Sequence, residues 1–310
     1  MIDHMATKCT IPVIDLHDFP NQLSKLVTTC EEWGCFRLLN HQDVLSPTLM
    51  SDMKTVVTSL FDLPVEIKRR NVDVITTSGY TPPTTASPLH ETLGFYDVAS
   101  GHDVDIFCDQ LDASSHQRET IKRYIEAVHE LFMEIAKKLA QGLGVKSESI
   151  GFENWACLFK LNKYYFTPQS VGSLGISTHT DSGFLAIVQD DDDVNGLEVM
   201  NKSGDFIPVD PWPGTLIVNT GDMAKVWSNG RFCNVKHRVR CKETKMRVSI
   251  ASFLLGPKGA VEPLEELVDD DHPRKYVSTT FEDYRKLRFS TKLLAGEALE
   301  LLYAPSSDNV

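Results

Sequence analysis

Three features are missing from this sequence of 310 residues, and each absence excludes a class of protein. No apolar run approaches the roughly 20 residues of a membrane-spanning helix, so we expect no membrane anchor. Lys and Arg number 31 against 43 Asp and Glu, and the net charge of −12 disfavours nucleic acid and membrane surfaces as partners. The start of the chain lacks the basic and apolar regions of a signal peptide, which predicts a cytoplasmic protein.

Paired cysteines are also missing. The seven cysteines are odd in number and form no CxxC pair with zinc-like spacing. We expect reduced thiols that are mostly buried. With apolar residues at 42% and charged residues at 24%, the chain has the composition of a globular protein with a sizeable core. Nothing in the composition indicates a homo-oligomer.

The first 145 residues predict short strands, helices and one loop. In chain order we expect a strand over 11–16, a helix over 23–34, a strand over 35–40, a helix over 46–64, an irregular loop over 71–110 and a long supporting helix over 111–145. The helix after Ser46 has a defined start, because serine caps it and Pro47 occupies its first turn. The loop is rich in turn residues, and loops of this length often line sites.

The region 154–257 changes to short alternating strands separated by turns. Eight such strands lie between LFKLNKYYF and MRVSIASFLL. They predict a double-stranded β-helix, or jelly roll, which commonly holds a site between its two sheets. We therefore expect a mainly-β fold with flanking helices, in which 1–110, 111–145, 154–257 and a C-terminal helical extension over 258–310 form one compact unit.

Two histidines and an aspartate suggest a metal site. His179 and Asp181 form an H-x-D pair on a predicted strand, where alternate residues point to the same face. His237 lies on a later strand, between Val235 and Val239. Two histidines and one carboxylate are the ligands of non-haem Fe(II) oxygenases, which leave positions open for substrate and dioxygen. So short a motif also arises by chance, with a structural histidine further along.

Two further polar pairs share the same spacing. Arg247 and Ser249 lie on the last strand of the region, and Asn162 and Tyr164 lie on its first. A guanidinium offers a planar fork to a carboxylate, while the amide and hydroxyl groups add further hydrogen-bonding atoms. Three converging polar pairs on separate strands are hard to explain as a solvated surface.

These segments resemble the plant 2-oxoglutarate and Fe(II)-dependent dioxygenases over most of the chain. The likeness runs through IPVIDL, EEWGCFRLLNH, DLPVEIK, LNKYYF, THTDSGFLAIVQ, NGLEVM, FIPVDPWPGTLIVNTGDM, WSNGRFCNVKHRV and MRVSIASFLLGP. The resemblance implies an iron site, a clamp for the distal carboxylate of 2-oxoglutarate and neighbours of that cosubstrate. The implied iron ligands are His179, Asp181 and His237. The implied clamp consists of Arg247 and Ser249, and the implied neighbours of the cosubstrate are Asn162 and Tyr164.

The resemblance also implies a reaction. With dioxygen, 2-oxoglutarate is decarboxylated to succinate and carbon dioxide while a bound small molecule is oxidised, and ascorbate serves as a reductant in vitro. Within the family, NVDVITTSGYTPP, FCDQLDAS, WSNGRFCNVKHRVRCKE and ASFLLGP look like the branch that oxidises auxin. This implies conversion of indole-3-acetic acid to 2-oxindole-3-acetic acid and auxin inactivation. The chain departs from the family pattern at 165–168 and at Gln42, which affects no implied ligand.

Strand alternation extends the inward face of the site. The wall candidates are Lys160, Phe253 and Leu255 from the strands and Tyr80, Phe95 and Tyr96 from the loop. A cation beside an aromatic wall suits an acidic aromatic substrate, so Lys160 is a candidate for binding its carboxylate. The alternative is a lysine that snorkels outward, and the loop aromatics are equally well explained as anchors of the loop.

Other interpretations stay open. His41 is expected to be a buried structural histidine, and the acidic run 190–193 a solvated turn. A gibberellin or a phenylpropanoid is an alternative substrate for an enzyme of the same family. A non-catalytic ligand-binding jelly roll or a zinc hydrolase is the alternative of another class, but neither needs the carboxylate clamp of Arg247 and Ser249.

Overall fold

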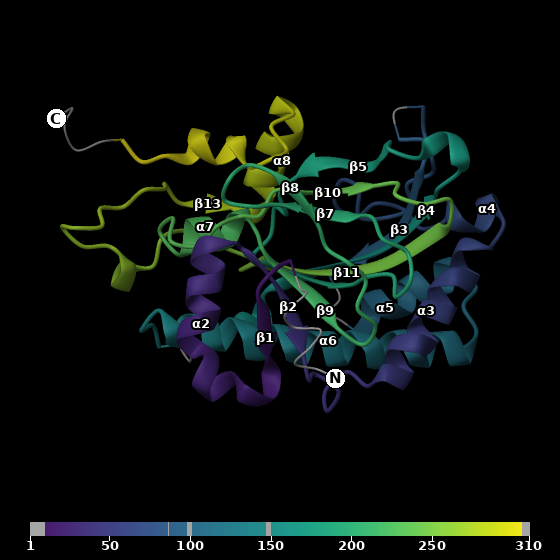
Figure 1. Ribbon diagram of the computed structural model, residues 1–310, viewed down its shortest axis with the longest axis horizontal. Coiled ribbons are helices and arrows are strands. Elements are labelled where there is room, and N and C mark those ends of the chain that lie inside the picture. The colour runs from purple at the N-terminus through teal and green to yellow at the C-terminus, as the bar shows by residue number, and fades with distance from the viewer. Residues whose placement is uncertain (1–9, 86, 98–100, 147–149, 306–310) are drawn as a thin grey trace.

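The computed structural model describes residues 10–85, 87–97, 101–146 and 150–305. Two β-sheets lie at its centre, with most helices beneath the larger sheet and a C-terminal helix beside the smaller one (Figure 1). No helix in the described ranges is long and apolar enough to cross a membrane.

The larger sheet has seven strands. In spatial order they are β1 (Val13–Asp15), β2 (Cys35–Leu39), β9 (Leu216–Thr220), β6 (Leu185–Gln189), β11 (Met246–Gly256), β4 (Ala156–Tyr165) and β3 (His90–Tyr96). Neighbours are antiparallel except for the parallel pair β1 and β2. The edge strand predicted over 11–16 is confirmed, because β1 lies at one edge of the sheet.

The smaller sheet has four antiparallel strands. In spatial order they are β5 (Leu174–His179), β10 (His237–Arg240), β7 (Leu197–Met200) and β8 (Phe206–Pro208). With β4, β6, β9 and β11 of the larger sheet they confirm the eight strands predicted over 154–257. A separate pair, β12 (Ala260–Val261) and β13 (Thr279–Thr280), follows in the C-terminal extension.

Helices surround the sheets. The α-helices are α2 (Phe19–Glu32), α3 (Pro47–Phe61), α4 (Val65–Lys68), α5 (Gly101–Gln110), α6 (Ser115–Gly142), α7 (Asp222–Trp227) and α8 (Phe281–Thr291). Short 3-10 helices lie at η1 (Leu16–Asp18), η3 (Phe152–Asn154), η4 (Pro168–Ser170), η5 (Glu265–Leu267) and η6 (Glu297–Leu302). The long helix α6 runs beneath the larger sheet and packs against α2, α3 and α5 (Figure 1). The predicted helices are thus confirmed.

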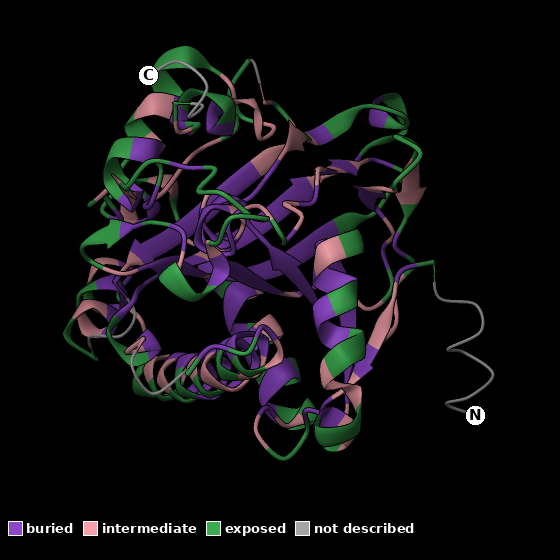
Figure 2. Cartoon of the chain, turned by 90° about the vertical axis from the view of Figure 1, so that its left-hand side faces the viewer, coloured by how far each residue is buried: buried purple, intermediate pink, exposed green. Residues whose placement is uncertain are grey.

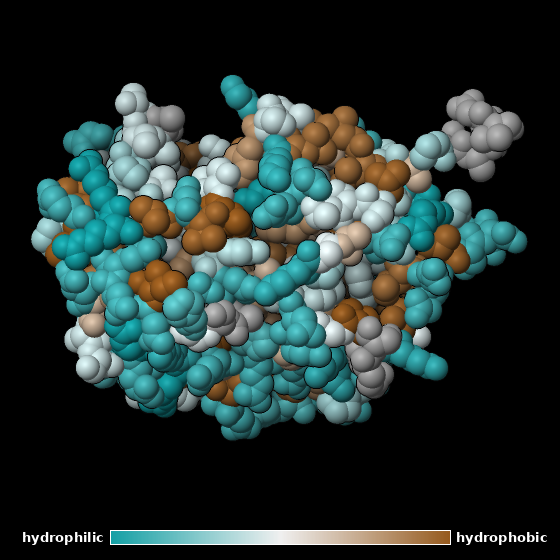
Figure 3. Space-filling view, turned by 180° about the vertical axis from the view of Figure 1, so that it is seen from behind, coloured by the Kyte–Doolittle hydropathy of each residue, from teal (hydrophilic) through white to brown (hydrophobic). Residues whose placement is uncertain are grey.

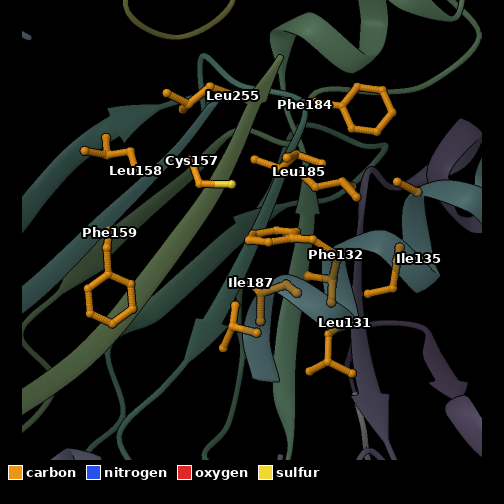
Figure 4. Packing of buried hydrophobic residues seen from close by; sticks show 14 of the residues in the cluster. Leu131, Phe132, Ile135, Cys157, Leu158, Phe159, Phe184, Leu185, Ile187 and Leu255 are labelled. Carbon is orange, nitrogen blue, oxygen red and sulfur yellow. The ribbon is translucent and has the colours of Figure 1, made fainter. Parts of the chain in front are cut away.

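Apolar side chains of α6 and the larger sheet form the main core. Leu131, Phe132 and Ile135 of α6 lie with Phe159 of β4 and Ile187 of β6 (Figure 4). The strands are largely buried, whereas the helices alternate between buried and exposed sides (Figure 2). The face of the molecule that points away from the viewer in Figure 1 is mostly hydrophilic, with separate hydrophobic patches (Figure 3). The helical periodicity of the sequence therefore corresponds to one buried side of each helix.

The cysteines and His41 have the predicted environments. The six cysteines that the structure describes are reduced thiols, and all but Cys233 are buried. Cys9 lies outside the described residues. His41 is fully buried, with its Nδ1 atom 3.2 Å from the carbonyl oxygen of Leu45. These groups are structural.

The segment 71–110 is more ordered than predicted, because it contains β3 and α5. Strand β3 pairs with β4 along its whole length. Its sequence does not resemble a buried strand because it contains the charged residue Glu91. In the structure Glu91 is buried, 2.6 Å from Lys68 Nζ and hydrogen-bonded to Tyr80. A charged residue at a core position breaks the apolar alternation from which strands are predicted. The irregular part of the segment ends before His90.

The start of α6 allows a test of local stability. Ser114 Oγ accepts a hydrogen bond from the Gln117 N–H at 3.2 Å, and Gln117 Oε1 accepts one from the Ser114 N–H at 2.7 Å. Ser114→Ala removes one of these bonds and is expected to lower the free energy of unfolding by about 1 kcal/mol. Urea unfolding measures it, with Ser203→Ala in an exposed turn as a control expected to stay within about 0.5 kcal/mol of the parent. An unchanged midpoint for Ser114→Ala would contradict the capping role.

Candidate active site

Three side chains of metal-binding type converge between the two sheets. His179 ends β5, Asp181 follows it, and His237 begins β10. Strands β5 and β10 are neighbours, with His179 opposite His237. Asp181 Oδ1 lies 3.9 Å from His179 Nε2 and 3.7 Å from His237 Nε2. The three ligand atoms lie within 4.8 Å of one another, which is close enough to hold one metal ion. We call these three residues the triad.

The backbone orients both imidazole rings of the triad. His179 Nδ1 lies 2.9 Å from the carbonyl oxygen of Ser177, and His237 Nδ1 lies 3.2 Å from that of Val235. A donated Nδ1 hydrogen leaves Nε2 as the metal-binding atom. Burial and the neighbouring His237 lower the pKa of His179 to about 4, so this imidazole is neutral at pH 7. Neutral imidazole is the form that binds metals.

The other two polar pairs lie side by side on β4 and β11. The antiparallel register places Tyr164 opposite Arg247 and Asn162 opposite Ser249. The guanidinium carbon of Arg247 lies 4.8 Å from the centre of the Tyr164 ring, as a cation–π contact. Strand alternation had placed each pair on one face, and the register joins the two pairs into one polar patch.

Arg247 is inaccessible to solvent, yet much of its hydrogen-bonding capacity is unused. It is 1% exposed, and its Nη2 pairs with Asp190, but Nε and Nη1 have no partner among the described residues. Unpaired donors on a buried cation are costly, so they fit a bound anion. The predicted solvated turn over 190–193 is wrong at its first half, because Asp190 pairs with Arg247 and Asp191 accepts a hydrogen bond from the Val248 N–H at 3.0 Å.

A cavity of about 310 Å³ lies between the sheets, and the triad and the polar patch line it. Its apolar lining residues are Ile176, Val188, Leu197, Val239, Ala251 and Phe253. A second cavity of about 310 Å³ adjoins the first and shares His179, Asp181 and Phe253 with it, and Leu255 forms part of its wall. Phe253 and Leu255 thus lie where strand alternation placed them.

Lys160 points into both cavities rather than outward. Its Nζ donates hydrogen bonds to the carbonyl oxygens of Thr77 at 2.6 Å and Gly79 at 3.2 Å, and to Thr92 Oγ1 at 3.2 Å. Burial lowers the pKa of this ammonium to about 7. The inward direction of the side chain agrees with strand alternation.

Comparison with known proteins identifies the family to which the chain belongs. Residues 155–256 match the 2OG-Fe(II) oxygenase superfamily, and residues 11–105 match the family described as non-haem dioxygenase in morphine synthesis N-terminal. A curated relative, the 2-oxoglutarate-dependent dioxygenase DAO of Oryza sativa subsp. indica, is 49% identical over 301 residues, which cover 95% of this chain and 99% of that protein. The chain belongs to the 2OG-Fe(II) oxygenase superfamily.

The fold of the oxygenase is similar to solved structures of related dioxygenases. The crystal structure of the dioxygenase for auxin oxidation (DAO) in rice matches with a TM-score of 0.87 and 48% identity, covering 95% of this chain and 100% of that one. The 2-oxoglutarate complex of AtDAO1 from Arabidopsis thaliana matches with a TM-score of 0.82 and 51% identity, covering 86% and 100%. The protein is accordingly an enzyme that uses Fe(II) and 2-oxoglutarate.

Three aromatic residues expected in the pocket wall of the oxygenase lie elsewhere. The Tyr80 hydroxyl donates to Glu91 at 2.7 Å, and Phe95 packs in the core with its ring centre 4.4 Å from that of Phe107. Tyr96 lines a separate groove beside α8. For Phe95 the cause is strand alternation: with Glu91 it lies on the face of β3 that points away from the cavity, and only recognition of the strand reveals this.

The residues of the oxygenase site that were not predicted include the polar residues His90, Thr92 and Asn219. His90 lies opposite Tyr164 on β3, with the ring centres 4.8 Å apart, and its Nε2 is 3.1 Å from Asn162 Oδ1. Burial lowers the pKa of His90 to about 4. Asn219 Nδ2 donates to Asp181 Oδ2 at 3.4 Å. The alternation of His90 and Thr92 was the available signal, but it depends on recognising β3 as a strand.

Proposed function

We propose that this oxygenase converts indole-3-acetic acid, the hormone auxin, into 2-oxindole-3-acetic acid and so inactivates it. The observation that carries the proposal is the 49% identity, over nearly the full length of both chains, to the rice dioxygenase DAO. The rice crystal structure at 48% identity is described as a dioxygenase for auxin oxidation. The fold itself supports many substrates, so it is the similarity over nearly the full length of both chains that favours auxin.

The proposal assigns Fe(II) to the triad. His179, Asp181 and His237 hold the ion, and the two sheets form a double-stranded β-helix around it. The inward Nε2 atoms and the neutral imidazole of His179 support this assignment. A set of three protein ligands leaves coordination positions for the cosubstrate and dioxygen.

The proposal assigns the distal carboxylate of 2-oxoglutarate to Arg247 and Ser249, with Asn162 and Tyr164 beside the cosubstrate. The two unpartnered nitrogens of Arg247 support it, because a carboxylate would accept hydrogen bonds from both. Asp190 occupies only Nη2 and leaves these two donors available. The residues present therefore fit the cosubstrate that the superfamily uses.

Binding and exclusion of water are the tasks of the protein in this reaction. When bound, iron and 2-oxoglutarate supply an oxidative decarboxylation that yields succinate and carbon dioxide and adds one oxygen atom to the substrate. Arg247 orients the cosubstrate, and the apolar walls at Phe253 and Leu255 receive the indole ring and exclude water. Lys160, at the polar end of the same cavity, attracts the carboxylate of the substrate.

Release of succinate tests the proposal. The purified protein is incubated with Fe(II), ascorbate and 2-oxoglutarate, and with indole-3-acetic acid, a gibberellin or a flavanone. We expect indole-3-acetic acid alone to stimulate succinate release, by about 10-fold or more, with a product heavier by one oxygen atom. Stimulation by another compound instead would reject auxin and retain the superfamily. No stimulation by any of the three would also reject the auxin proposal.

A further inference from the structure

Two cations from distant parts of the chain meet at one end of the second cavity. We propose that Arg285 of α8, with Lys160 of β4 and the hydroxyl of Thr77, forms the receptor for the carboxylate of the substrate. The inference rests on the proposed oxidation of an acidic substrate. In it, Arg285 determines the specificity for substrates that carry a carboxylate. Arg285, Lys160 and Thr77 all line the cavity that also contains His179 and Asp181.

Thr77 is the point at which both cations meet. Arg285 Nη2 donates to Thr77 Oγ1 at 2.9 Å and also to the carbonyl oxygen of Thr76. Lys160 Nζ donates to the carbonyl oxygen of Thr77 at 2.6 Å. Thr77 itself has a φ of 61°, a left-handed conformation that a β-branched residue rarely adopts. Such conformations persist where surrounding contacts enforce them, and they concentrate at binding sites.

The two cations lack a directly paired counter-ion among the described residues, although Asp73 attracts both of them electrostatically. Within the described ranges no carboxylate forms an ion pair with Lys160 or Arg285, and the Nε of Arg285 is buried without a partner. The acid in the adjacent loop, Asp73, accepts hydrogen bonds from the backbone N–H groups of Thr77 and Gly79 instead. Two partly buried cations without a carboxylate, in a chain of net charge −12, indicate a site for an anionic ligand.

The next arginine on α8 shows the contrast. Arg288 forms an ion pair with the fully buried Asp222 and donates to the backbone oxygen of Thr180, so its charge is already compensated. Burial lowers the pKa of Lys160 to about 7 and that of Arg285 to about 10, and the attraction of Asp73 offsets the effect of burial only in part. A bound carboxylate would reverse both effects.

The backbone leaves room for this arrangement. At Gly94 of β3 an added Cβ would lie 2.5 Å from the carbonyl oxygen of Phe159, 2.6 Å from that of Ser78 and 2.7 Å from Lys160 Cδ. A larger residue would therefore displace the β4 backbone, the loop or the lysine. The apolar lining residues of this cavity are Leu158, Ile176, Phe253, Leu255, Phe289 and Leu294, and the centre of the Phe289 ring lies 5.2 Å from the guanidinium carbon of Arg285. A carboxylate held at the cationic end directs a flat apolar ring toward these walls and the triad.

A bound carboxylate would give Arg285 and Lys160 a stronger hydrogen-bond acceptor than the neutral oxygens that they contact now. Arg285 and Lys160 now donate to uncharged carbonyl and hydroxyl oxygens of residues 76–79. A hydrogen bond from a cation to a carboxylate is roughly twice as strong as one between neutral groups. The site therefore discriminates a carboxylic acid from the corresponding amide.

Equilibrium binding to the loaded protein tests this proposal. The protein with Fe(II) and 2-oxoglutarate, kept free of dioxygen, is titrated by calorimetry with indole-3-acetic acid, indole-3-acetamide, a gibberellin and a flavanone. We expect the parent protein to bind an acid at least about 10-fold more tightly than the amide. Arg285→Gln is expected to weaken binding of that acid by about 10- to 100-fold and to leave the amide nearly unchanged.

Control variants separate recognition from folding. Lys286→Gln changes an exposed lysine on the same helix and should bind the acid like the parent protein. Arg285→Lys keeps the charge and should restore part of the lost affinity, while 2-oxoglutarate binding should stay unchanged in all three variants.

The outcomes separate this proposal from the auxin proposal. If the parent binds a gibberellin acid rather than indole-3-acetic acid, and Arg285→Gln loses that affinity, the auxin proposal is rejected and the carboxylate site is supported. Equal binding of acid and amide by the parent, binding of the flavanone alone, or unchanged acid binding by Arg285→Gln would each overturn the site.

Discussion

Replacing His179 by alanine is expected to reduce the iron content of the reconstituted protein from about one ion per chain to below about 0.1. Two remaining ligands cannot hold Fe(II) against water, because the oxygenase contributes only three side chains in this group. Succinate release should fall by on the order of 1,000-fold as a consequence. Iron is measured by mass spectrometry after anaerobic loading and gel filtration, so the test does not depend on activity.

The matched control is His272→Ala. The His272 side chain is 67% exposed and contacts Asp269 on the surface. This variant should bind iron and release succinate like the parent protein, because it lies outside the triad. Full iron occupancy in His179→Ala, with the fold retained by circular dichroism, would remove His179 from the ligand set.

Replacing Arg247 by glutamine is expected to weaken 2-oxoglutarate binding by about 100-fold or more while iron content stays unchanged. The loss is large because a bidentate, charge-assisted contact in a solvent-free place is removed. The substitution also leaves Asp190 without its partner, in a position where burial already raises the pKa of that carboxyl. The free energy of unfolding should therefore fall by about 3 kcal/mol.

A double variant separates these two effects. Arg247→Gln with Asp190→Asn removes the stranded carboxylate, so stability should recover in part while 2-oxoglutarate binding stays lost. Arg231→Gln, which breaks an exposed ion pair with Glu31, is the control and should change neither quantity appreciably. Recovery of 2-oxoglutarate binding in the double variant would show that Arg247 supports the fold rather than the cosubstrate.

The strands and the polar pairs could be predicted because their signals are local. Strand alternation alone places Arg247 with Ser249 on a common face. It also predicted His179 and Asp181 together, although β5 ends at His179 and Asp181 lies just beyond the strand. The longest helix follows from its apolar spacing and from its termination near Gly142. These features depend on neighbours a few residues apart, which the sequence displays directly.

Strand β3 could not be predicted by the same means. It is held by pairing with β4, and its buried Glu91 is compensated by Lys68, which lies on another element. Without that partner the segment looks like a polar loop. The positions of Tyr80 and Phe95 were therefore assigned to the wrong surroundings, and His90 was overlooked.

The acidic run after β6 was interpreted differently from sequence for a related reason. Four consecutive aspartates are typical of a solvated turn. The tertiary structure instead brings Asp190 to Arg247 and Asp191 to Lys54 and the β11 backbone. Electrostatic pairing between distant segments has no periodicity that a sequence can reveal.

The sequence by itself determined the antiparallel strands with flanking helices, the candidate metal ligands and the candidate carboxylate clamp, because each follows from residue chemistry and spacing that the chain displays directly. Only the tertiary structure decided which groups surround them. It placed Asp190 on Arg247, His90 on Tyr164, and Arg285 beside Lys160. Those pairs join segments separated by tens to more than a hundred residues, and only the folding of the chain brings such segments together.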